Sequence, residues 1–160
     1  MAVDLKSLGK VELAALGLGG LSILLSFFGS YVRASVDGGG LFEGVSAGSN
    51  AWTSYATLGM LLIVAGTAVV AVRAFAAETL PAGVPWNLVA LATSALGTLL
   101  IVLRAVTASD SGFGVSVGPG WSGYALFVTT IGLTACTALL FKSSGEKIPG
   151  VKTATPPPAA

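Results

Sequence analysis

Four long runs of uncharged, mostly apolar residues constrain the fold of this chain more than any other feature. The runs contain 20, 29, 25 and 31 residues, and their charged boundaries are Glu12 and Arg33, Glu43 and Arg73, Glu78 and Arg104, and Asp110 and Lys142. A helix needs about 20 apolar residues to cross the hydrocarbon layer, and within lipid it satisfies its own backbone hydrogen bonds. The sequence therefore predicts an all-α membrane protein, a bundle of four transmembrane helices near residues 11–32, 53–75, 86–106 and 122–141.

The composition argues against an enzyme and agrees with burial in lipid. Only 9% of the residues are charged, against about a quarter in soluble domains. The chain has no histidine and one cysteine, Cys136, which excludes an intramolecular disulfide, a histidine-based metal site and a Ser-His or Cys-His pair. All the charged residues fall at span ends, in loops or in tails, whereas a proton-coupled carrier, a voltage sensor or an intramembrane hydrolase needs a charge within the layer. We expect no catalytic residue, cofactor or metal, and the absence of a basic block predicts no nucleic-acid partner.

Proline and tryptophan mark the boundaries of the spans. Pro81 and Pro85 fall in the short second connection, where a helix cannot continue. Trp52, Trp86 and Trp121 each stand at the start of a span, the level at which an indole ring prefers the lipid headgroups.

The distribution of lysine predicts the orientation. Two lysines precede the first span, and the other three lie from Lys142 to the C-terminus. Because positive residues favour the cytoplasmic side, both termini should be cytoplasmic, in a multi-pass protein of the plasma membrane. We divide the chain into a cytoplasmic segment (1–10), a transmembrane domain (11–142) and a disordered cytoplasmic tail (143–160).

The two halves of the sequence resemble each other. Each half has an arginine at the outer end of its first span, a glycine-rich loop and a Trp-x-x-Tyr-Ala segment; these residues are Arg33, Trp52 and Tyr55, then Arg104, Trp121 and Tyr124. The pattern predicts a parallel duplication of a helix–loop–helix unit. Convergence is the alternative, since outer loops commonly attract aromatic and arginine anchors.

The two outer loops are candidates for a small β-sheet. Phe113, Val115 and Val117 alternate with glycine and serine, and a period of two is typical of a strand. The two loops would then pair as a sheet that caps the bundle, and flexible loops are the alternative.

Six residues are candidate contacts for a partner protein or a lipid headgroup, namely Arg33, Arg104, Trp52, Trp121, Tyr55 and Tyr124. An arginine guanidinium suits a phosphate or a carboxylate. The alternative for the arginines is an internal ion pair with Asp37 or Asp110.

Small residues recur along the spans, including Gly59 and Gly66 in the second and Ala90, Ser94 and Thr98 in the third. Such residues let helix backbones approach closely in lipid. They predict either packing within the bundle or an interface with another subunit.

The chain resembles the small four-helix membrane proteins of actinobacteria, most of which are uncharacterised. The residues that carry this resemblance are Trp52-Thr-Ser-Tyr55, Gly120-Trp121-Ser-Gly123 and Arg104. The architecture is also similar to claudin-type tetraspan proteins, but the paired loop cysteines of that family are missing, so no function transfers.

These observations predict a non-catalytic accessory subunit or scaffold that binds a larger membrane complex. Its partners would be the lipid bilayer and other membrane subunits, with a homo-oligomer as a further option. The alternative function is binding or carrying a lipid or another hydrophobic ligand between the two helix pairs.

Overall fold

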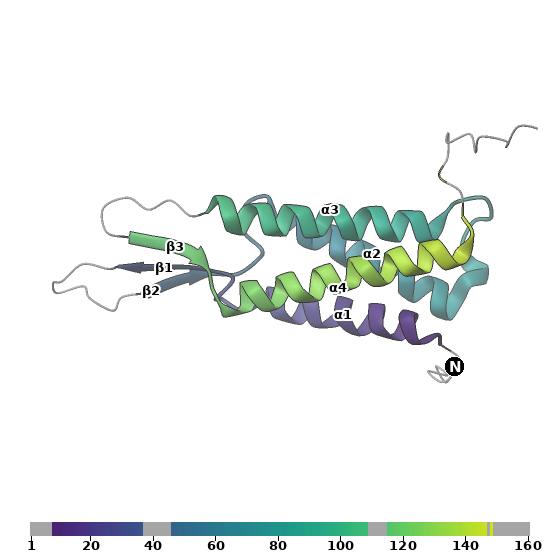
Figure 1. Cartoon of the computed structure of the whole chain (residues 1–160), viewed down its shortest axis with the longest axis horizontal. Coiled ribbons are helices and arrows are strands. Elements are labelled where there is room, and N and C mark those ends of the chain that lie inside the picture. Colours follow the sequence, from purple (N-terminus) through teal and green to yellow (C-terminus); the bar gives the residue numbers. More distant parts are fainter. Residues whose placement is uncertain (1–7, 37–45, 109–114, 147, 149–160) are drawn as a thin grey trace, which may run out of the picture.

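The computed structural model describes residues 8–36, 46–108, 115–146 and 148. They form four long helices, a short 3-10 turn and three strands: α1 (Lys10–Ser26), β1 (Val32–Val36), β2 (Ser46–Ser49), α2 (Ala56–Ala76), η2 (Ala77–Thr79), α3 (Trp86–Thr107), β3 (Val115–Pro119) and α4 (Trp121–Ser144). The helices lie side by side along the long axis, and the strands extend from one end of them (Figure 1). Helix α1 begins and α4 ends at the opposite end of the bundle (Figure 1).

The first helix is shorter than the expected span 11–32, because it ends at Ser26. At this end of α1, the Ser26 carbonyl accepts a hydrogen bond from the backbone N–H of Ala51 (3.1 Å). The chain then turns and enters β1 at Val32. The second helix also begins later than expected, at Ala56 instead of residue 53, whereas α3 begins at the expected residue and α4 one residue earlier.

At the end of the bundle opposite the sheet, the residues after α4 hold the start of α3. Helix α4 continues to Ser144 and ends at Gly145, which adopts the left-handed conformation that commonly terminates helices (φ 67°). The Glu146 carboxylate then accepts hydrogen bonds from the backbone N–H groups of Asn87 (3.0 Å) and Leu88 (3.2 Å). The expected disordered tail, residues 143–160, includes this turn and the last two residues of α4; the rest of that tail, apart from residue 148, lies outside the described part of the chain.

The helices pack through small and weakly polar residues. Contacts link α1 with α4, α4 with α3, α3 with α2, and α2 with α1. A side chain added at Gly19 of α1 would collide with Thr67 of α2. The Ser22 hydroxyl of α1 donates a hydrogen bond to the Thr129 hydroxyl of α4 (2.9 Å), and that of Thr98 on α3 donates to the Thr130 carbonyl of α4 (3.1 Å). Part of the small-residue pattern is therefore explained by packing within the bundle.

The outer surface of the bundle carries the large apolar side chains. Exposed leucine, isoleucine, valine and phenylalanine occur on all four helices, among them Leu24, Leu61, Leu99 and Ile131. Three helices, α2 with its following turn, α3 and α4, are long and apolar enough to cross a membrane. The interior combines many small or weakly polar residues with a few large ones such as Met60 and Leu126, and the abundant large apolar residues outside differ from the polar surface of a water-soluble bundle.

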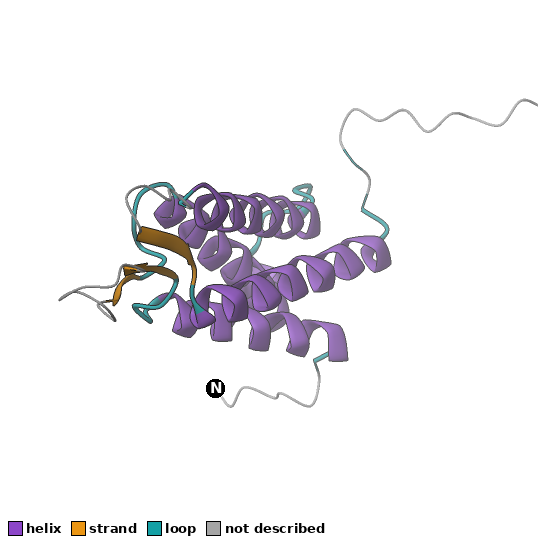
Figure 2. Cartoon of the chain, turned by 60° about the vertical axis from the view of Figure 1, so that its left-hand side comes forward, coloured by secondary structure: helices purple, strands orange, loops and turns teal. Residues whose placement is uncertain are grey.

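The first and third connections contribute to one three-stranded antiparallel sheet, so the predicted pairing of these two loops is confirmed. The strand order is β2-β1-β3, with β1 in the centre. Seen in the turned view, the three strands gather at one end of the helices (Figure 2). Of the predicted alternating residues, Val115 and Val117 lie in β3, and Phe113 lies outside the described residues.

Candidate interaction surface at the sheet end

Aromatic side chains gather where the helices meet the sheet. The Trp52 indole N–H donates a hydrogen bond to the Ser26 hydroxyl (2.9 Å), and its ring stacks on that of Phe27 at 5.6 Å between centroids. The Trp121 ring meets the edge of Phe28 at 5.3 Å and is 55% exposed. Aromatic rings at the end of an apolar bundle are typical of the membrane–water interface.

Arg104 and Tyr55 meet between α2 and α3. The guanidinium carbon of Arg104 lies 5.9 Å from the centre of the Tyr55 ring, and the Tyr55 hydroxyl is hydrogen-bonded to that of Thr107. Among the described residues, the buried Nε of Arg104 has no hydrogen-bond partner. A cation–π contact therefore positions this arginine, and it contributes about 0.5–1 kcal/mol at an exposed site.

Tyr31, which the sequence analysis did not single out, connects the sheet with the helices. It is fully buried, and its hydroxyl donates a hydrogen bond to the Ile101 carbonyl of α3 (2.5 Å). Its own backbone carbonyl accepts from Gly120, just before α4 (3.1 Å). Burial raises the pKa of the Tyr31 phenol to about 12, against a smaller lowering by the Arg104 charge. The residue lies between α1 and β1, and its burial follows only from the way these segments fold together.

The turn that contains residues 29–31 packs closely against three glycines. A Cβ added at Gly48, Gly120 or Gly123 would collide with a carbonyl oxygen of this turn. Gly120 and Gly123 belong to the Gly-Trp-Ser-Gly segment that the sequence analysis noted. Because Gly120 and Gly123 have no side chain, the turn can lie directly against the start of α4.

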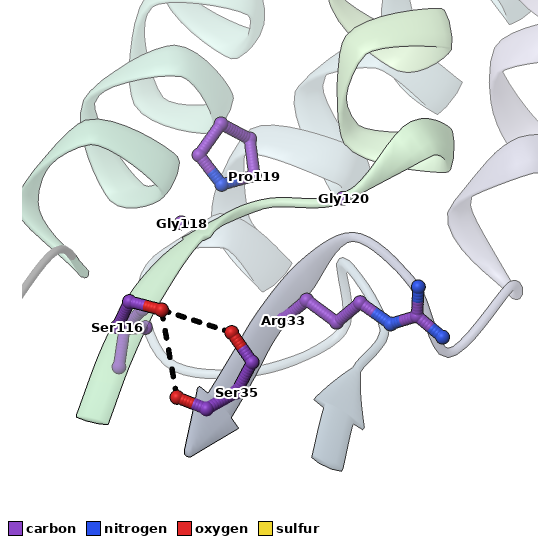
Figure 3. Close-up of a pocket in the computed structure, with 7 residues that line it drawn as sticks. Arg33, Ser35, Ser116, Gly118, Pro119 and Gly120 are labelled. Carbon is purple, nitrogen blue, oxygen red and sulfur yellow. Dashed lines mark hydrogen bonds between the residues drawn. The ribbon is translucent and has the colours of Figure 1, made fainter. Parts of the chain in front are cut away.

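Arg33 lines an open depression of about 410 Å³ on one face of the sheet (Figure 3). The other lining residues belong to β1, to β3 and to the start of α4; they are Ser35, Ser116, Val117, Gly118, Pro119 and Gly120. The Ser35 and Ser116 hydroxyls bond each other across the strands at 2.9 Å (Figure 3). The pairs expected for Arg33 with Asp37 and for Arg104 with Asp110 involve acidic residues outside the described part of the chain.

The residues matched by the internal repeat differ in local structure. Arg33 lies in β1 and Arg104 in the last turn of α3. Trp121 is the first residue of α4, whereas Trp52 precedes α2 by four positions. Tyr124 lies on the outside of α4, 60% exposed, with its ring against that of Phe127 at 6.1 Å.

The structure thus brings all six candidate residues to the sheet end of the bundle: Arg33 lies in β1, Trp52 and Tyr55 precede α2, Arg104 lies in the last turn of α3, and Trp121 and Tyr124 lie in the first turn of α4. The surface offers cations, hydroxyls and aromatic rings, which suit the binding of anions and membrane headgroups. Among the described residues, no three His, Cys, Asp or Glu side chains group as metal ligands would. No protein-family model matches the chain, and no curated protein is similar to it.

Proposed function

We propose that this chain is a non-catalytic integral membrane protein that crosses the membrane four times and serves as an accessory subunit or scaffold of a larger membrane complex. The observation that carries the proposal is the position of the large apolar side chains, which cover the outside of all four helices. Such a surface needs lipid or other apolar helices around it, because water would not solvate it.

Helix α1 would be the fourth span. Its 17 residues extend about 25 Å, which is at the lower limit for crossing the hydrocarbon layer. The helix packs along α4 and α2, and Leu13, Leu21 and Leu24 on its outer side are exposed. The lysine distribution supports cytoplasmic termini, with the sheet on the opposite side. We also propose that the two helix–loop–helix halves arose by duplication, supported by the two Trp-x-x-Tyr-Ala segments.

The sheet supplies a means of binding a partner. β2 is an edge strand, and its residues Ser46 to Gly48 are exposed. An exposed edge offers unpaired backbone groups to which an extended segment of another protein can add. The competing function, carriage of a hydrophobic ligand between the helix pairs, has less support, because the contacts of α2 with α3 and of α1 with α4 bring the two pairs together.

The proposal is tested by extracting the protein from its native membranes with a styrene–maleic acid copolymer and analysing what migrates with it. We expect a stable complex with another membrane protein. Ala47→Lys on the β2 edge should release the partner without changing the thermal stability of the purified chain, because a lysine discourages strand addition. Ala82→Lys, in the exposed connection at the other end of the bundle, is the matched control. A wild-type chain that migrates alone or only with copies of itself would refute an accessory role.

A further inference from the structure

Arg33 lies on a face of the sheet that has open space above the neighbouring strand β3. In the antiparallel register, Arg33 lies opposite Gly118, and Ser35 lies opposite Ser116. Side chains two residues apart on a strand point to the same face, so Arg33 and the two serines share one side of the sheet. The depression lies on this side (Figure 3).

Gly118 leaves this depression open. A Cβ added at Gly118 would meet no atom within 4 Å, so the space next to Arg33 on the β3 side is open. On the β2 side, Arg33 lies opposite Gly48, where an added Cβ would collide with the Gly29 carbonyl oxygen. Of the two glycines opposite Arg33, the one on β2 therefore has no room for a side chain and the one on β3 has open space.

We propose that the Arg33 depression binds the phosphate of an anionic phospholipid headgroup. The inference rests on the proposed membrane location. Arg33 is exposed, and it forms no ion pair with a residue in the described part of the chain. The Ser35 and Ser116 hydroxyls line the same depression, the Arg33 side chain extends away from them (Figure 3), and its guanidinium is the group that matches the oxygens of a phosphate.

The location favours a lipid over the carboxylate of a partner protein. Gly118 precedes Trp121 by three residues, which spans at most about 10 Å of extended chain. Trp121 and Phe28 form the aromatic contact expected at the interface, so Arg33 falls within reach of the headgroup layer. Phosphates are abundant at that depth, and the volume of about 410 Å³ is in the range of small-ligand sites.

Native mass spectrometry of the purified chain tests this proposal. The detergent-solubilised protein is mixed with equal amounts of dioleoyl phosphatidylglycerol and dioleoyl phosphatidylcholine, and the retained lipid is counted. We expect the wild-type chain to retain the anionic lipid preferentially. Arg33→Gln, which removes the charge, and Gly118→Val, which fills the open position, should each lower this retention about fivefold, the effect of a surface charge pair of about 1 kcal/mol.

Lys142→Gln is the matched control, since it removes the same charge near the far end of α4 and should leave retention unchanged. Thermal unfolding of each variant in detergent confirms that it is folded. Unchanged retention in either Arg33→Gln or Gly118→Val overturns the site. Displacement of the lipid by an equal concentration of inorganic phosphate, or loss of a protein partner in Arg33→Gln with the lipid retained, also overturns it.

This measurement uses the purified chain without its complex, so its outcome separates the two proposals. A chain that migrates alone from native membranes but loses phosphatidylglycerol in Arg33→Gln would refute the accessory role and support the lipid site.

Discussion

Gly59 of α2 and Gly97 of α3 face each other so closely that the carbonyl oxygen of each occupies the space of the other's missing side chain. A Cβ added at Gly97 would lie 2.8 Å from the Gly59 oxygen, and one added at Gly59 would lie 3.0 Å from the Gly97 oxygen. The first distance is shorter than real Cβ contacts and the second is at their lower limit, so glycine at these two positions allows the helices to approach this closely. This contact joins the first helix pair to the second.

Gly97→Val should therefore separate α2 from α3. Because backbone atoms form the opposing surface, we expect a loss of about 1–3 kcal/mol in the free energy of unfolding, the usual cost of overpacking. Thermal unfolding in detergent, followed by tryptophan fluorescence, measures the effect. Gly17→Val in α1 is the control, because a Cβ added there meets no atom within 4 Å. Equal stability of the two variants would show that the close approach does not hold the bundle together.

Single cysteines should report which side of the membrane each end of the bundle occupies. In a Cys136→Ala background, we expect Ser46→Cys on β2 to react with an impermeant maleimide in intact cells. Gly9→Cys before α1 and Ser144→Cys at the end of α4 should react only after permeabilisation, because four crossings place both on the other side from β2. Gly9→Cys and Ser46→Cys labelled from the same side would mean that α1 does not cross the membrane.

Tyr31→Phe should weaken the link between the sheet and α3. Loss of the hydrogen bond to the Ile101 carbonyl should cost about 0.5–1.5 kcal/mol of unfolding free energy near neutral pH. The folded-state pKa of about 12 exceeds the usual value of 10.0, so the contribution of the neutral phenol is present below pH 10 and is lost as the pH rises toward 12. The wild-type chain should thus lose more stability than Tyr31→Phe over this range in detergent unfolding. Parallel pH profiles for the two proteins would contradict the assignment.

Glu146→Ala should loosen the start of α3. The carboxylate accepts from two backbone N–H groups in the first turn of the helix, and loss of a capping side chain typically costs about 1 kcal/mol. Hydrogen exchange at Asn87 and Leu88 should become faster, whereas exchange near the middle of α3 should not change. Glu78→Ala, an exposed glutamate in η2, serves as the control. Unchanged exchange at Asn87 and Leu88 would show that the cap does not protect them.

The sequence by itself determined the helical class of the protein and the approximate position of each helix. Long uncharged, apolar runs are typical of membrane-spanning helices, and Pro81 and Pro85 place the second connection between α2 and α3. The alternation of apolar and small residues around Val115 and Val117 was sufficient to predict a strand, because the two-residue repeat of a strand can be read from neighbouring residues alone. The position of Trp121 at the end of the bundle could also be predicted from neighbouring residues, because it is an aromatic residue at the start of an apolar run.

Only the tertiary structure decided where α1 ends and how the interaction surface is assembled. Residues 27–32 include the apolar Phe27, Phe28 and Val32, yet the helix ends at Ser26, whose carbonyl accepts a hydrogen bond from Ala51, distant in sequence. Ser35, Ser116 and Gly118 join Arg33 through strand register, which depends on pairing between segments about 80 residues apart. Tyr31 becomes buried only when α3 and α4 surround it. Hydropathy and residue period depend on neighbours along the chain, whereas these contacts depend on neighbours in space.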